Sequence, residues 1–224
     1  MRRKAFRKRP RISRAKMARR RVGIRRPRPQ IHYFKRTFRV GDLIASYNAT
    51  TGVTTPINNG LSFNLTQLPN YTELTSLYDQ YMIKGIRVNI QPLLTEGIAS
   101  AVSGSTNIWG YPKLSTVIDY DDSTIPASED VYMQYSTLRQ TGAFKEHKRY
   151  FKPKCRLAGL DAGATITANT VRGANWIDTG VPTVPHYGLK VFQPGPIASG
   201  TPLVSSSIAY SVYATMYVAC KNVR

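Results

Sequence analysis

The chain has 224 residues, of which 42% are hydrophobic, so it is long enough to form one domain with a buried core. Residues 1–40 carry 18 of the 32 Lys and Arg residues and no acidic residue, whereas residues 41–224 carry 14 basic and 12 acidic residues. This distribution excludes a uniformly basic globular protein and predicts a nearly neutral folded body that carries a polycationic arm.

Cysteine content and hydropathy exclude further classes. Cys155 and Cys220 are too few for a disulfide framework or a four-cysteine zinc site, and we expect both to be apolar residues within strands. Residues 191–220 are uncharged, but their three prolines and many serines would make a poor membrane helix. The N-terminus has charge without an apolar segment, which argues against a secretory signal. We therefore expect no membrane partner.

The first predicted segment, residues 1–32, is an arm that is disordered on its own because it has too little apolar surface to fold. Arginine outnumbers lysine 12 to 3 within residues 2–28, and its planar guanidinium suits phosphate contacts. We expect salt-dependent binding to nucleic acid with little sequence choice, and the arginine runs are also typical of a nuclear import signal. The predicted nucleic-acid-binding residues of the arm are Arg2, Arg3, Lys4, Arg7, Lys8, Arg9, Arg11, Arg14, Lys16, Arg19, Arg20, Arg21, Arg25, Arg26 and Arg28.

The second predicted segment, residues 33–224, is a β-sandwich, because period-two alternation of apolar and polar residues recurs along it. Three sets of alternating residues each predict one buried face: Leu61, Phe63 and Leu65; Met82, Ile86, Val88 and Ile90, interrupted by Lys84; and Ile208, Tyr210, Val212, Ala214, Met216, Val218 and Cys220. Further predicted strands, bounded by turn residues, are Tyr33–Ala45, Leu114–Tyr120, Arg139–Phe144, His147–Arg156, Ala164–Ala168 and Tyr187–Phe192.

Helical patterns are rare in this body. We predict only two short helices, Tyr71–Asp79 and Ser128–Tyr135, the second with Ser128 as its N-cap. About eight antiparallel strands with long connections rich in Gly, Ser, Thr and Pro favour an all-β fold, a single jelly-roll β-sandwich. An immunoglobulin-like sandwich is the structural alternative.

Candidate catalytic residues are scarce. His32, His147 and His186 share no metal-ligand spacing, and we expect them to be structural or surface residues. Asp119, Asp121 and Asp122 could converge on a hard cation, but a strand-ending turn or a salt bridge to a neighbouring subunit is the favoured interpretation. No phosphate-binding loop or nucleophile motif occurs. We therefore predict a non-enzyme with no catalytic residue, no metal and no cofactor.

A second basic run is interleaved with the aromatic residues Phe144, Tyr150 and Phe151, a combination typical of surfaces that bind single-stranded nucleic acid. Its predicted nucleic-acid-binding residues are Lys145, Lys148, Arg149, Lys152 and Lys154, and Arg156 follows them. In a strand these basic residues fall on both faces, so some must point into an interface or a loop. The alternative to nucleic-acid binding is an ordinary solvated face.

The sequence resembles the capsid proteins of circoviruses and related small circular single-stranded DNA viruses. The similarity lies in the Arg-rich start, then LYDQYMIKGIRVNIQP, TVIDYDDSTIP, the KRYFKP segment at Lys148–Pro153 and the closing YSVYATMYVAC. No single motif is diagnostic, but their succession behind such an arm is fairly specific. Residues 157–185 match none of the family's motifs.

The resemblance implies a viral jelly roll that self-assembles, in about sixty copies, into a small icosahedral shell with the arm inside on a circular single-stranded DNA genome. It also implies residence in the virion and the host cell nucleus, with host nuclear import receptors and host cell-surface attachment factors as partners. Two alternatives remain, a small RNA-virus or satellite coat protein and a ribosomal or RNA-structural protein, although the latter usually has a basic globular part. The sequence alone does not separate DNA from RNA, since arginine contacts to the backbone do not read the 2′-hydroxyl.

Overall fold

The computed structural model describes residues 30–94, 101–102, 105–106, 109–121, 123–158, 169–173, 175–198 and 205–223. The predicted arm up to residue 29 and the predicted strand Ala164–Ala168 lie outside these residues. The first strand, β1, begins at Ile31, two residues before the predicted start of the body. Among the described residues, no helix has the length and apolar character needed to cross a membrane.

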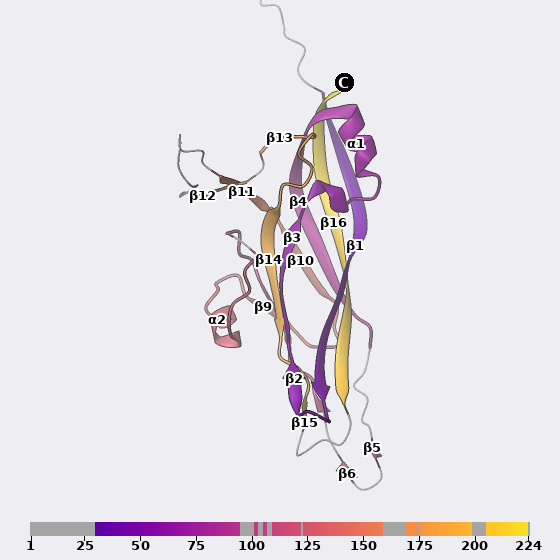
Figure 1. Cartoon of the computed structure of the whole chain (residues 1–224), viewed down its shortest axis with the longest axis vertical. Coiled ribbons are helices and arrows are strands. Elements are labelled where there is room, and N and C mark those ends of the chain that lie inside the picture. Colours follow the sequence, from indigo (N-terminus) through magenta and orange to yellow (C-terminus); the bar gives the residue numbers. More distant parts are fainter. Residues whose placement is uncertain are drawn as a thin grey trace, which may run out of the picture.

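Two antiparallel sheets form the molecule (Figure 1). The first sheet has the strand order β10–β4–β16–β1, with the short strands β2 beside β1 and β13 beside β4. Its members are β1 (Ile31–Asn48), β2 (Val53–Thr55), β4 (Tyr78–Pro92), β10 (His147–Phe151), β13 (Ile177–Asp178) and β16 (Ser206–Val223).

The second sheet is centred on β14, which pairs with β3 along one edge and with β8 and β11 along the other. Its members are β3 (Ile57–Phe63), β8 (Leu114–Val117), β9 (Arg139–Thr141), β11 (Lys154–Ala158), β12 (Asn169–Gly173) and β14 (His186–Gln193). Two small ribbons complete the described β structure: β5 (Ala101–Val102) with β6 (Ser105–Thr106), and β7 (Trp109–Gly110) with β15 (Ile197–Ala198).

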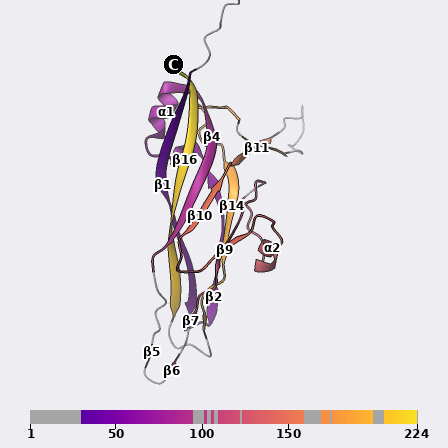
Figure 2. The same cartoon turned by 180° about the vertical axis from the view of Figure 1, so that it is seen from behind.

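The eight principal strands pair in a nested order. The first strand, β1, pairs with the last, β16; β3 pairs with β14, β4 with β10, and β8 with β9. The chain passes between the two sheets as these pairs close, which is the topology of a jelly roll. This arrangement confirms the predicted fold class over the immunoglobulin-like alternative. Figure 2 shows β1, β16, β4 and β10 side by side.

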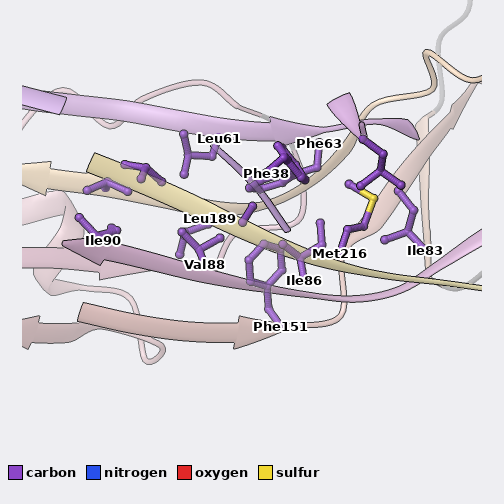
Figure 3. Close-up of a cluster of buried hydrophobic side chains, with 14 of the residues drawn as sticks. Phe38, Leu61, Phe63, Ile83, Ile86, Val88, Ile90, Phe151, Leu189 and Met216 are labelled. Carbon is purple, nitrogen blue, oxygen red and sulfur yellow. The ribbon is translucent and has the colours of Figure 1, made fainter. Parts of the chain in front are cut away.

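The hydrophobic core lies between the two sheets (Figure 3). Phe38, Val88 and Met216 of the first sheet meet Phe63 and Leu189 of the second. The predicted inward residues of β16, from Ile208 to Cys220, all belong to this core, so that alternation is confirmed. Cys155 and Cys220 are both free and buried within strands, as predicted.

At the start of β4, the prediction of which residues face the core is wrong. Tyr217 of β16 pairs with Gly85, but the next residue, Val218, pairs with Ile83, so Lys84 is the extra residue of a β-bulge. The bulge changes which side chains face inward. Ile83 therefore joins Ile86 in the core, whereas Met82 is buried outside the main core cluster.

The predicted strand His147–Arg156 is divided in two. β10 ends at Phe151, and β11 begins at Lys154 in the other sheet, because Pro153 cannot donate a backbone hydrogen bond to a continuous ladder. The predicted strand Leu114–Tyr120 ends early, at Val117. Similarly, the predicted strand Arg139–Phe144 ends at Thr141.

Both predicted helices occur but are shorter than expected. The helix α1 (Tyr71–Leu77) ends where β4 begins at Tyr78, and α2 (Glu129–Met133) is a single short helix. Ser128 occupies the N-cap position of α2 without a side-chain capping hydrogen bond, while Glu129 lies in its first turn. Leu65, predicted as a strand residue, belongs to the 3-10 helix η1 (Leu65–Gln67), although it is buried as expected.

Candidate nucleic-acid interface

The face of the first sheet that points away from the core is rich in basic and aromatic side chains. We call it the basic aromatic face, and its strands in register place neighbouring side chains in rows across the sheet. It comprises Lys35, Thr37 and Arg39 of β1; Tyr213, Thr215 and Tyr217 of β16; Arg87 and Asn89 of β4; and Lys148 and Tyr150 of β10.

Two rows dominate this face. In one row Tyr150 lies opposite Arg87, and Arg87 lies opposite Thr215. In the next row Lys148 lies opposite Asn89, which lies opposite Tyr213. Each row therefore combines a cation with an aromatic ring, the two components of a surface for single-stranded nucleic acid.

Carboxylates on this face are paired with its cations. Arg39 forms a salt bridge with Asp42, and Lys148 forms one with Glu146. The hydrogen bond from Lys148 is the main cause that lowers the pKa of Glu146 below its usual value. Such exposed pairs contribute little to stability and are readily exchanged for other partners.

Other cations of the face are unpaired. Among the described residues, no carboxylate lies within salt-bridge distance of Lys35 or Arg87, and both are exposed. These side chains are available to phosphates.

The predicted basic run is split by the division of the strand. Lys145, Lys148 and Lys152 are exposed, so the structure leaves them available for phosphate contacts. Lys154 is half-buried, and its ammonium lies 4.5 Å from the centre of the Tyr120 ring, a cation–π contact on the other sheet. The side chain of Arg156 lies outside the described residues.

Arg149 points inward, in contrast to its neighbours. Its guanidinium donates a hydrogen bond of 2.7 Å to the carbonyl of Thr137, and its Nε is buried without a partner in the described structure. Burial lowers the pKa of the Arg149 guanidinium, and repulsion from Arg139 lowers it further. Arg149 is therefore placed to hold the loop after α2 rather than to bind a ligand.

Only one of the three aromatic residues in the predicted run is exposed. Phe151 is buried and its ring lies 6.0 Å from that of Phe63, while Phe144 packs against Tyr111 at 5.1 Å. Tyr150 remains 53% exposed on the basic aromatic face. Its neighbours Arg87 and Tyr217 were not among the predicted site residues, because only strand pairing brings them together.

Asp119, the first residue of the acidic cluster, has a structural role within this chain. Asp119 follows β8 and accepts a hydrogen bond of 3.1 Å from the N–H of Asp121, which is the predicted strand-ending turn. Its Oδ2 lies 2.8 Å from the ammonium of Lys190, a residue of the same chain rather than of a neighbouring subunit. Asp122 lies outside the described residues.

In the described part of the chain, no three His, Cys, Asp or Glu residues could hold a metal ion together. His147 is buried between the hydroxyls of Thr116 and Thr141, at 2.7 and 2.5 Å. His186 is buried and its Nδ1 lies 2.9 Å from the carbonyl oxygen of Val184. Both are structural residues, as predicted.

Comparison with known proteins identifies the family. The family described as Circovirus capsid protein matches residues 2–224, which is nearly the whole chain. The chain belongs to the circovirus capsid protein family. Membership of this family indicates a viral structural protein of the virion and not an enzyme, in agreement with the sequence analysis.

Solved structures of other circovirus capsid proteins share the fold. The 60-mer of the BFDV capsid protein aligns with a TM-score of 0.57 at 18% identity, covering 87% of this chain and 95% of that chain. The decameric BFDV capsid protein aligns with a TM-score of 0.52 at 19% identity, covering 86% of this chain and 100% of that chain. No curated protein matches the sequence of this circovirus capsid protein.

Proposed function

We propose that this capsid protein assembles into a small icosahedral shell of about sixty copies around circular single-stranded DNA. The observation that carries the proposal is the segregation of charge. Residues 2–28 carry 15 basic residues, whereas residues 41–224 are nearly neutral, with 14 bases against 12 acids. A body of this kind can associate with copies of itself while the arm neutralises a polyanion.

The structural relative and the basic aromatic face support the proposal. The BFDV capsid protein, which has been solved as a 60-mer, shares the jelly-roll fold of this chain, so a fold of this kind can build a closed shell. β1 begins at Ile31, directly after the arm in sequence, and belongs to the sheet that carries the basic aromatic face. The two cationic regions of the chain can therefore act on the same nucleic acid.

The amount of charge fits a small genome. Sixty copies of residues 1–40, with 18 basic residues each, supply on the order of a thousand positive charges, enough to neutralise roughly a kilobase of single strand. We expect a genome of order one to two kilobases, with mobile cations and the basic aromatic face neutralising the rest.

The test is assembly of the expressed full chain, followed by electron microscopy and digestion of the extracted nucleic acid with DNase and RNase. Replacing half of the arm arginines by alanine should shorten the packaged DNA or give empty shells. The matched control replaces the same arginines by lysine, which keeps the charge and should package normally if charge neutralisation governs packaging. Full-length DNA in the alanine variant would contradict packaging by the arm, and RNase-sensitive cargo would contradict the proposed packaging of DNA.

We further propose that the arm directs nuclear import through host import receptors, since its arginine runs are typical of such signals. The same two variants test this in transfected cells. Import that depends on basic charge should survive the lysine variant and fail in the alanine variant. Nuclear accumulation of both would mean that another part of the chain is recognised.

A further inference from the structure

We propose that Tyr150 and Tyr217 form a stacking platform for an unpaired base on the basic aromatic face. This inference rests on the proposed packaging of single-stranded nucleic acid and assigns it a contact with bases in the folded body, in addition to the phosphate contacts of the arm. The platform combines three features: an exposed ring, a fixed orientation of that ring, and cations beside it.

The ring of Tyr150 is held in place by Gly85. A Cβ atom built at Gly85 would lie 2.4 Å from the Tyr150 hydroxyl oxygen and 2.9 Å from two ring carbons, so the tyrosine covers the backbone where a side chain is missing. Any residue larger than glycine would displace the ring. Because the ring already packs on the strand backbone at Gly85, a base that stacks on it need not first order the side chain.

Tyr217 fixes a second side of the ring. The two ring centroids are 6.2 Å apart and their planes meet at 76°, the edge-to-face geometry that aromatic pairs prefer. Tyr150 nevertheless stays 53% exposed. An exposed tyrosine ring that two neighbours already orient is a surface for a flat aromatic partner, and a nucleobase is such a partner.

The cations around the platform are placed for the sugar-phosphate backbone of a stacked base. Arg87 lies directly across from Tyr150 on β4, and Lys148 is two residues away along β10, which is about 7 Å at the usual strand rise. Lys35 lies opposite Tyr217 on the other side. Paired bases of a duplex hide their faces, so this surface selects single strands.

The experiment compares two oligonucleotides with the same phosphate charge, a thymidine 20-mer and an abasic 20-mer, binding to the full chain. Elevated salt of about 0.5 M weakens the arm's phosphate contacts and exposes the contribution of stacking. We expect the thymidine 20-mer to bind roughly tenfold more tightly than the abasic one. Tyr150→Leu, which still covers Gly85, should bring thymidine binding down to the level of abasic binding, whereas Tyr150→Phe should keep the preference.

Photocrosslinking provides an independent measurement. An oligonucleotide that carries 5-iodouracil should crosslink to Tyr150 or Tyr217, as located by mass spectrometry, and the crosslink should be lost in Tyr150→Leu. The control is Tyr187→Leu, on β14 of the other sheet, which should change neither the preference nor the crosslink.

The outcomes separate this inference from the proposed function. Equal binding of both oligonucleotides by the unmodified chain, or an unchanged preference in Tyr150→Leu, overturns the platform and leaves packaging by charge intact. Failure of the full chain to bind either oligonucleotide at low salt overturns the packaging function and the platform with it.

Discussion

The Lys190 ammonium lies 2.8 Å from the Asp119 carboxylate, and both side chains are largely buried, with 5% and 14% exposure. Burial alone would raise the pKa of Asp119, but hydrogen bonds from Lys190, the Asp121 N–H and the Tyr135 hydroxyl outweigh it and hold the pKa below 3.8. The two residues are 71 positions apart in sequence, so the pair ties the loop before α2 to the central strand β14.

Removing the cation from this pair should destabilise the fold strongly. Lys190→Met leaves the Asp119 carboxylate buried without its cation, and we expect the free energy of unfolding to fall by about 3–5 kcal/mol, as measured by urea denaturation. The double variant Asp119→Leu with Lys190→Met should recover much of this loss. As a control, Lys148→Met breaks an exposed pair and should change stability by less than about 1 kcal/mol. An equal loss of unfolding free energy in Lys190→Met and Lys148→Met would show that burial does not make the Lys190–Asp119 pair more important than the exposed pair.

Acidification should destabilise the protein through His147. Burial, with added repulsion from Arg139 and Arg149, lowers the pKa of His147 from 6.5 to about 4. The folded state therefore favours the neutral imidazole. The free energy of unfolding is unaffected by this group above pH 6.5, and it falls by about 3 kcal/mol in total as the pH drops from 6.5 to 4.

The variant His147→Gln tests this prediction, because the amide does not titrate and can still bond both threonine hydroxyls. Urea midpoints measured between pH 7 and pH 5 should fall in the unmodified protein and stay nearly constant in the variant. The same slope in both proteins would assign the acid sensitivity to other groups.

Adding one methyl group at Gly188 should destabilise the core. A Cβ there would lie 2.5 and 2.6 Å from two ring carbons of Phe151, which is buried in the core. We expect Gly188→Ala to lower the free energy of unfolding by about 1–3 kcal/mol. Gly110→Ala is the matched control, since its nearest neighbour is the Ile197 carbonyl oxygen at 3.6 Å, an ordinary contact. An unchanged free energy of unfolding in Gly188→Ala would show that β14 and Phe151 can move apart.

The two thiols should be inert in the folded protein. Burial raises the pKa of the Cys220 thiol to about 11, and Cys155 is 1% exposed. The thiolate is the reactive form, so a disulfide reagent at pH 8 should modify neither residue until the chain is unfolded in guanidinium. Rapid modification of the native protein would mean that β11 or β16 opens readily.

The sequence predicted much of the fold because many strands follow their own local pattern. The alternation in residues 208–220 identified every inward side chain of β16, since that strand is buried on one face along its length. The start of β4 was mispredicted because the bulge at Lys84 arises from pairing with β16, and no local signal in β4 reveals it. The division of His147–Arg156, in contrast, has a local signal in Pro153, which cannot donate a backbone hydrogen bond to a continuous strand ladder.

The candidate site was only partly predictable for the same reason. Lys148 and Tyr150 stood out because basic and aromatic residues are adjacent in the chain, whereas Arg87 and Tyr217 reach them only through the pairing of three strands. The partner of Asp119 was likewise hidden, because Lys190 lies on a distant strand. Whether the arm residues bind nucleic acid stays a prediction that rests on composition.

The pairing of the first strand with the last has a consequence for the timing of synthesis. Ile31 pairs with Lys221, so nearly the whole body must leave the ribosome before β1 finds its neighbour. Contacts of such long sequence separation make folding slow. We expect the arm to emerge from the ribosome first and to remain attached to an incompletely folded body until β16 pairs with β1. A prematurely terminated chain that lacks β16 therefore cannot complete the jelly roll.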